Sequence, residues 1–511
     1  MGTRKHWEHP LVAKNIHIGR FCSARKKRLR CVLAGIGHAA TELVLTRQCA
    51  DVSRLVYQMR INGDRIQESL LANFDGDLRA SLEIVLGSNL PDAAWWQAAL
   101  GVGSGGLGLR QAQHVALGAF VASRLASRPH VQTLAEDMNS AGLGATDVIM
   151  AAYDERSLSA LKRLLGELPP DAGCDLLEKL ENAGTVAQEV WDNLLSGTDS
   201  QVDEEQPRRS RRAGVGARVL PDDGDMDAEH PDSTARGRTL RIQRIIMEYI
   251  DKGVHDTLLG SIQDAGDATG SRRLRELSHP DVDHTWLWRL NKHRGSILSE
   301  EEFIEALRLR LGCAGPIEPT ICQLCGDAIM DSRGAHAMCC AKAESTVGHY
   351  KVTNVILTGV QQVDPGAETE VRGLIPGTDL RPADILTVSV GGGSIALDIG
   401  ICSPDAQHAG DDCTASMYSR KTAYYAPHAA ALDRQNISYQ PLTFSAFGRP
   451  HPQSTAFLRT LSKQIARRRG CSDAGAIYAS LARNIGTEIS RRAARQVLSC
   501  WPNTSDLEPD G

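Results

Sequence analysis

A group of cysteines and one histidine between residues 322 and 340 constrains this chain more than any other feature. Two residues separate Cys322 from Cys325, and His336 and Cys340 follow at a spacing that one helical turn can bring together. Three thiolates and one imidazole suit a tetrahedral Zn²⁺, and four protein ligands close the site, so the ion would be structural. Cys339 is adjacent and could replace Cys340. The alternatives are a redox-active Cys-x-x-Cys pair or unrelated thiols.

The composition is that of a folded protein with several domains. A chain of 511 residues is too long for one ordinary core. No run of about 18 apolar residues predicts a membrane span. Thirteen cysteines without a secretory signal favour reduced thiols and an intracellular location. The net charge of −5 does not indicate nucleic-acid binding, but basic residues cluster at 25–30, 208–212 and 467–469, as solvated surface or as phosphate contacts.

Hydrophobic spacing separates a helical part from an α/β part. Apolar residues recur near a 3.6-residue period up to about residue 195 and again at 239–315, which predicts helices. Residues 196–238 carry too few apolar side chains to offset their ordering entropy, so we expect a disordered linker. The first strand signals lie at 385–390 and 395–401, joined by glycines, and predict a β-hairpin.

A set of acids and one lysine follows the cysteines. Asp384 opens the first strand of the hairpin, and Asp398 lies on the second strand, opposite its apolar face. Carboxylates on neighbouring strands suit Mg²⁺ or Mn²⁺ for phosphodiester hydrolysis. Glu370 would add a third oxygen, and Lys421 would orient water or stabilise the phosphorus. Strand register, which the sequence leaves open, decides whether the two aspartates share a metal. The alternative is a set of ordinary acids at strand ends.

The stretch from Cys322 to Phe447 resembles the endonuclease end of non-LTR retrotransposons that carry a restriction-like, PD-(D/E)xK nuclease. In that family a Cys-Cys-His-Cys knuckle precedes an Arg-His-Asn box, an Arg/Lys-Pro-Asp motif, a second Asp and a displaced Lys. The matching residues here are His349, Arg381-Pro-Ala-Asp384 and Asp398.

Gly400 stands two residues after Asp398, so the resemblance makes Lys421 the displaced lysine. The resemblance extends upstream, where 49–57, 92–97 and 105–110 are similar to the region that follows the palm of the same elements' reverse transcriptases. No aromatic-x-Asp-Asp box with a palm before it is found in the sequence. Reverse transcriptase activity is therefore not expected.

The expected fold is multidomain, with a mainly α N-terminal half and a C-terminal α/β PD-(D/E)xK-like endonuclease domain that carries a small zinc knuckle. The expected segments are a basic N-terminal segment (1–34), a helical thumb- and connector-like region (35–195), the disordered linker (196–238), a helical connector (239–315), the zinc knuckle (316–345), the endonuclease domain (346–470), and a C-terminal helical region with a tail (471–511).

The resemblance implies a retrotransposon-derived, metal-dependent endonuclease that nicks a DNA target. Its cofactors would be a structural Zn²⁺ and a catalytic Mg²⁺ or Mn²⁺. Asp384 and Asp398 would hold the catalytic cation. The alternative is a catalytically inactive, nucleic-acid-binding remnant of a retrotransposon polyprotein. The expected partner is DNA, with element RNA and a separate reverse transcriptase as further candidates, and no membrane. We expect a nuclear location.

Overall fold

The computed structural model describes residues 36–182, 235–290, 297–314, 320–342, 344–388, 390 and 393–501. The basic N-terminal segment predicted at 1–34 lies outside these residues, and so does the predicted linker up to residue 234. The linker prediction extends four residues too far at its end, because helix α10 begins at Ala235. Among the described residues, no helix combines the length and apolarity needed to cross a membrane.

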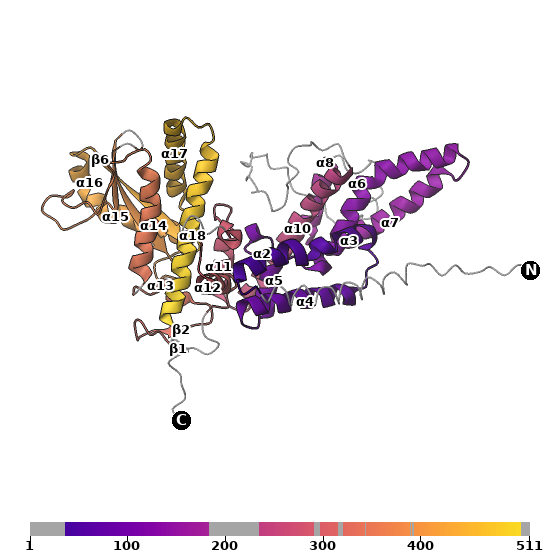
Figure 1. Cartoon of the computed structure of the whole chain (residues 1–511), viewed down its shortest axis with the longest axis horizontal. Coiled ribbons are helices and arrows are strands. Elements are labelled where there is room, and N and C mark those ends of the chain that lie inside the picture. Colours follow the sequence, from indigo (N-terminus) through magenta and orange to yellow (C-terminus); the bar gives the residue numbers. More distant parts are fainter. Residues whose placement is uncertain are drawn as a thin grey trace, which may run out of the picture. The chain divides into compact units, whose positions relative to one another are not determined.

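The fold is mainly helical, with a small mixed sheet in the C-terminal part, as the coarse prediction had it (Figure 1). The chain divides into two compact units. The first contains Gln48–Leu78 and Arg110–Thr257, and the second contains Arg30–Arg47, Arg79–Leu109 and Leu258–Gly511, so far as these ranges are described. The predicted 35–195 region is therefore not one packing unit, because residues 79–109 pack with the second unit.

The first unit is a helical bundle with an apolar core. Phe120, Leu161, Leu176 and Ile246 are among its fully buried residues, each from a different helix. The Asp75 carboxylate accepts hydrogen bonds from the first N–H groups of α6, which satisfies donors that a helix start leaves unpaired. Its main helices are α3 (Val56–Asn62), α6 (Ala112–Ser140), α7 (Thr146–Gly166), α8 (Pro170–Asn182) and α10 (Ala235–Asp264), which ends in the second unit. Helix α4 (Glu68–Leu86) runs from the first unit into the second.

The second unit holds the sheet and both candidate metal sites. Its helices before the sheet are α2 (Ala39–Leu45), α5 (Asp92–Ala99), α11 (Ala268–Leu277), α12 (Glu300–Leu311), α13 (Ala335–Cys339) and α14 (Glu344–Val360). Its later helices are α15 (Cys413–Tyr425), α16 (Ala429–Asp433), α17 (Pro452–Arg469) and α18 (Ala474–Cys500).

The sheet has four strands in the order β3-β4-β5-β6. Strand β4 pairs antiparallel with both β3 and β5, whereas β5 and β6 are parallel, with Asp398 opposite Pro441. The strands are β3 (Glu368–Thr369), β4 (Ile385–Thr387), β5 (Ser394–Cys402) and β6 (Ile437–Ser445). The predicted hairpin is thus β4–β5, although Gly391 and Gly392 of its turn lie outside the described residues.

Both faces of the central strand β5 are covered. Ile395, Leu397 and Ile399 face the core made by α14, α17 and α18. Ala396 belongs to a smaller cluster on the other face, which contains Leu432 of α16 and is bordered by Tyr425 of α15. The sequence predicted one core face for this strand, but a strand covered by helices on both sides buries both. Asp398 is therefore 8% exposed although it is a charged residue.

Helix α18 joins the sheet to the cysteine group (Figure 1). Its first two-thirds contribute Leu481, Ile485 and Ile489 to the core under the sheet, and its last turns contribute Val497 and Cys500 to the core beside the cysteines. The segments predicted separately as 346–470 and 471–511 thus share one core.

Gly348 allows α14 and α18 to approach closely. A Cβ at this position would lie 2.3 Å from Cγ of Arg492. A larger residue would clash with the Arg492 side chain, which gives a packing reason for glycine at this position.

Candidate functional site

The four predicted zinc ligands converge in the structure. The Sγ atoms of Cys322, Cys325 and Cys340 and a ring nitrogen of His336 all lie within 4.8 Å of one another. Tetrahedral zinc with Zn–S bonds of about 2.3 Å needs ligand atoms about 3.8 Å apart, so a small contraction completes the geometry. This cluster, the knuckle, could bind a zinc-like metal ion. Among the described residues, no other group of three or more Cys, His, Asp or Glu side chains converges in this way.

Local backbone structure builds the knuckle. A two-stranded ribbon, β1 (Thr320–Ile321) with β2 (Ile329–Met330), flanks the turn from Cys322 to Gly326. Gly326 has a φ of 72°, which favours glycine, and its N–H donates to the Cys322 carbonyl at 2.9 Å. Burial raises the pKa of the Cys322 thiol, but hydrogen bonds from the N–H groups of Cys325 and Leu324 outweigh it and lower the pKa to about 6. The thiolate form, which metals bind, is thereby favoured.

The structure selects Cys340 over Cys339 as the fourth ligand. Helix α13 presents His336 in its first turn, and Cys340 caps its end, with the Cys340 N–H donating to the His336 carbonyl at 2.8 Å. Cys340 is buried in the knuckle, whereas the adjacent Cys339 is exposed. Adjacent residues at a helix end point in different directions, so only one of them can face the other ligands.

Sequence reasoning missed a further thiol, the fourth, beside the three thiols of the knuckle. Cys500, the last residue of α18, is fully buried and belongs to the same core cluster as Cys322 and Cys340. Its carbonyl accepts a hydrogen bond from the Gln323 N–H at 3.2 Å. The only sequence signal was a cysteine at the end of a long amphipathic helix, which says nothing of where that helix packs.

The strand register brings the two predicted metal-binding aspartates together. Ile385 pairs with Leu397, so Asp384, one residue before Ile385, lies beside Asp398. The Asp384 carboxylate accepts a hydrogen bond from the Ile399 N–H at 2.7 Å. Burial raises the pKa of Asp398, and the nearby charge of Asp384 raises it further. The ion pair with Lys421 and the hydrogen bond from Tyr439 lower it, but the pKa stays above its usual value. Two carboxylates thus lie side by side on neighbouring strands in the middle of the sheet.

Lys421 reaches these acids from α15. Its Nζ lies 2.6 Å from Oδ1 of Asp398, within direct ion-pair distance. Gly400 leaves room for it, because a Cβ on Gly400 would lie 2.7 Å from Cε of Lys421. A lysine from helix α15 therefore fills the space above Gly400, the strand position two residues after Asp398. Asp384, Asp398 and Lys421 form the acid–lysine site.

Two further side chains complete the acid–lysine site. His349, on α14, places Nε2 3.3 Å from Oδ2 of Asp384 and 3.2 Å from the Ile399 carbonyl. Burial lowers the pKa of His349, but the hydrogen bond and charge of Asp384 outweigh it and raise the pKa above its usual value. Tyr439, on β6, donates its hydroxyl to Oδ2 of Asp398. The sequence pointed to His349 through the resemblance alone, and it gave no signal for Tyr439, because that contact depends on the parallel pairing of β6 with β5.

The structure places Glu370 at the margin of this site. Its carboxylate pairs with Arg381 at 3.3 Å, and its N–H donates to the Asp384 carbonyl at 3.2 Å. Among the described residues, Glu370, Asp384 and Asp398 do not form a converging group of three ligands. An assisting role for Glu370 stays a prediction.

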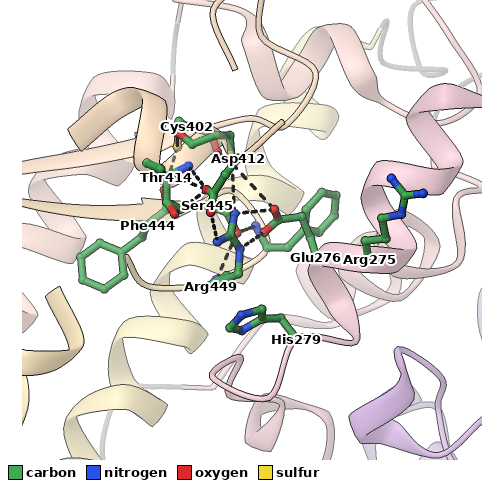
Figure 2. A network of polar contacts seen from close by, with 12 residues as sticks. Arg275, Glu276, His279, Cys402, Asp412, Thr414, Phe444, Ser445 and Arg449 are labelled. Atoms are coloured by element: carbon green, nitrogen blue, oxygen red, sulfur yellow. Dashed lines mark hydrogen bonds and ion pairs between the residues drawn. The ribbon is translucent and has the colours of Figure 1, made fainter. Parts of the chain in front are cut away.

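A buried charge network holds the start of the lysine-bearing helix (Figure 2). Arg449 makes paired hydrogen bonds to Glu276 of α11, at 2.9 and 2.8 Å, and to Asp412, at 3.0 and 2.7 Å. Asp412 is the N-cap of α15 and accepts hydrogen bonds from the N–H groups of Thr414 and Ala415. Arg449 and Glu276 are each about one-tenth exposed. The network therefore fixes the start of α15, and Lys421 lies on this helix two turns further along.

Comparisons with known proteins do not assign this chain to a family. No family model, curated protein or solved structure matches the chain. The account of the two sites therefore depends on the residues and contacts described above.

Proposed function

We propose that this chain is a metal-dependent DNA endonuclease of the restriction-like kind, related to the C-terminal part of a non-LTR retrotransposon polyprotein. The observation that carries the proposal is the acid–lysine site, in which Lys421 of α15 pairs with Asp398 while Asp384 lies beside it on the neighbouring strand. An α/β sheet with acids on adjacent strands supports the PD-(D/E)xK fold that the resemblance implies. A nearby knuckle of the expected ligand types supports the same family.

The donors of the site fit a hard cation. Asp384 and Asp398 offer carboxylate oxygens, the ligands that Mg²⁺ and Mn²⁺ prefer. When bound, such a cation would polarise a phosphoryl oxygen and lower the pKa of a coordinated water. The Lys421 ammonium would stabilise the negative charge that builds on the phosphate, and His349 would hold the Asp384 carboxylate in orientation.

A second candidate is a catalytically inactive, nucleic-acid-binding remnant. One observation favours it: the protein's own donors occupy the carboxylate oxygens, with Lys421 and Tyr439 on Asp398 and the Ile399 N–H on Asp384. Carboxylates satisfied in this way do not need a cation. Under this alternative the knuckle and basic residues would bind phosphates while the acids stay idle.

Nicking of supercoiled plasmid by the zinc-loaded full chain separates the two candidates. We expect nicked circles in Mg²⁺ or Mn²⁺, with activity lost in Asp398→Ala and lowered on the order of 100-fold in Lys421→Met. DNA affinity should stay similar or rise in Asp398→Ala, because a negative charge near the phosphates is removed. Wild-type protein that binds DNA but never nicks it in either cation would favour the remnant.

A further inference from the structure

Three tyrosine rings lead from the solvent to the acid–lysine site. Tyr424 packs edge-on against Tyr425, with ring centroids 5.0 Å apart, and Tyr425 lies 4.7 Å from Tyr439. Tyr439 ends the series by donating its hydroxyl to Asp398. The outermost ring, Tyr424, is 59% exposed. An exposed aromatic ring at the outer end of a series of rings that leads to a buried carboxylate is a feature that core packing does not require.

The spacing along α15 places a cation one helical turn before each of the two rings on this helix. Residues four apart lie on the same side of a helix, so Arg420 is beside Tyr424 and Lys421 is beside Tyr425. Arg420 and Tyr424 form the exposed stripe, while Lys421 and Tyr425 form the stripe that faces the sheet. One face of α15 thus presents a guanidinium and an aromatic ring together, next to the stripe that carries the lysine of the acid–lysine site.

Cations beside aromatic rings are the combination that binds single-stranded nucleic acid. The cations track the phosphates, and unpaired bases stack on the rings without regard to sequence. A base inside a duplex is stacked on its neighbours and cannot offer its face to a side chain without leaving the helix. An exposed ring beside a hydrolytic site is therefore useful when the nucleotide next to the cleaved phosphate is unpaired.

We infer that Tyr424, with Arg420, forms a base-stacking subsite for an unpaired nucleotide next to the scissile phosphate. This inference deepens the proposed function and rests on it: the preferred substrate has a single-stranded or frayed segment at the cut. Arg420 contacts a phosphate, Tyr424 stacks on the base, and Tyr425 supports the Tyr424 ring. The hydroxyl of Tyr425 donates to the Arg381 carbonyl at 3.0 Å, which holds this supporting ring in place.

Binding measured without added Mg²⁺ tests the subsite apart from cleavage. A labelled single strand and a blunt duplex of the same sequence are titrated with the zinc-loaded full chain. Wild type is expected to bind the single strand more tightly. Tyr424→Ala should weaken single-strand binding about tenfold and leave duplex binding unchanged. Tyr424→Phe should keep wild-type affinity, because the ring and not the hydroxyl stacks.

A matched control and a direct stacking signal sharpen the test. Tyr57→Ala removes a tyrosine that is 68% exposed in the first unit and should change neither affinity. A 2-aminopurine base in the single strand should be quenched by wild type and by Tyr424→Phe, and much less by Tyr424→Ala. Equal effects of Tyr424→Ala on single strand and duplex, or no effect on either, would overturn the subsite and leave the nuclease proposal standing. No binding to either nucleic acid would overturn both.

Discussion

The knuckle and the acid–lysine site lie in the same unit but are assembled in opposite ways. All four knuckle ligands come from one short stretch, Cys322 to Cys340, and a turn and one short helix bring them together. The acid–lysine site takes Asp384 and Asp398 from paired strands and Lys421 from a later helix. The knuckle offers four protein ligands, whereas the acid–lysine site offers two carboxylates, so a cation held there would keep positions for water and substrate. The first suits a structural ion and the second a reacting one.

The difference separates what supports the fold from what would perform the chemistry. Loss of the knuckle should unfold its surroundings, because a small ribbon and a five-residue helix have little apolar core of their own. Loss of the acid–lysine site should leave the fold in place. The predictions below follow that contrast, from the largest effect to the smallest.

The largest effect is expected at the knuckle. The purified protein should carry about one Zn²⁺, and Cys325→Ser should abolish it, together with a stabilisation on the order of 10 kcal/mol that metal binding supplies. Metal analysis and thermal unfolding measure both. Cys471→Ser removes an exposed cysteine and is the matched control. A folded, reduced wild-type sample without metal would contradict the knuckle.

The charge network beneath α15 should rank next. Arg449→Gln leaves the buried Glu276 without its partner, so we expect a loss of about 3–5 kcal/mol in the free energy of unfolding. Arg275→Gln changes an exposed arginine of the same helix as Glu276 and should cost less than about 0.5 kcal/mol. Urea unfolding of both variants measures the difference. Equal, small losses would show that the network does not stabilise this region.

Gly400 should affect the chemistry and spare the fold. In Gly400→Ala the new methyl meets Cε of Lys421, the flexible end of a side chain, which can move aside at low cost. The ion pair with Asp398 would be displaced, so nicking should fall about tenfold while stability changes by less than about 1 kcal/mol. In the Lys421→Ala background the same substitution should have no further effect on nicking. Full activity of Gly400→Ala would separate Lys421 from the reaction.

The smallest effect is a pH dependence. The hydrogen bonds from Arg449 hold the pKa of Asp412 well below its usual range, although partial burial opposes them. In acid the folded state therefore binds fewer protons at Asp412 than the unfolded state, so its stabilisation is present at neutral pH and is lost as the pH falls below about 4. Asp412→Asn keeps an N-cap side chain and removes the charge. Between neutral pH and pH 2, unfolding measurements should show a shallower loss in the variant. Parallel curves would contradict the prediction.

How far sequence reasoning reached differs between the two sites. Spacing alone identified Cys322, Cys325 and His336, since close ligands in one stretch need no knowledge of the rest of the fold. It left Cys339 and Cys340 open, because side-chain direction at a helix end depends on where the helix ends. Cys500 was out of reach, since its position depends on how α18 packs.

The acid–lysine site depended on strand pairing. The alternation of apolar residues along β5 predicted that Asp398 lies on the face opposite Ile399. Only the strand register shows that Asp384 lies beside Asp398. Tyr439 enters through the parallel pairing of β6, and Lys421 needed the space above Gly400. The helical character of the first half was predicted from periodicity, yet the grouping of residues 79–109 with the second unit was not, because periodicity does not say which helices share a core.

Direct binding of Mn²⁺ tests the central claim that the acid–lysine site holds a divalent cation. Electron paramagnetic resonance of free Mn²⁺ during a titration of the zinc-loaded chain measures it without any need for cleavage. The account predicts about one bound Mn²⁺ in wild type, lost in Asp384→Asn and in Asp398→Asn, and kept in Asp147→Asn, which changes an exposed acid of the first unit. A titration in which wild type binds no Mn²⁺, or in which Asp398→Asn binds it as wild type does, would contradict the claim.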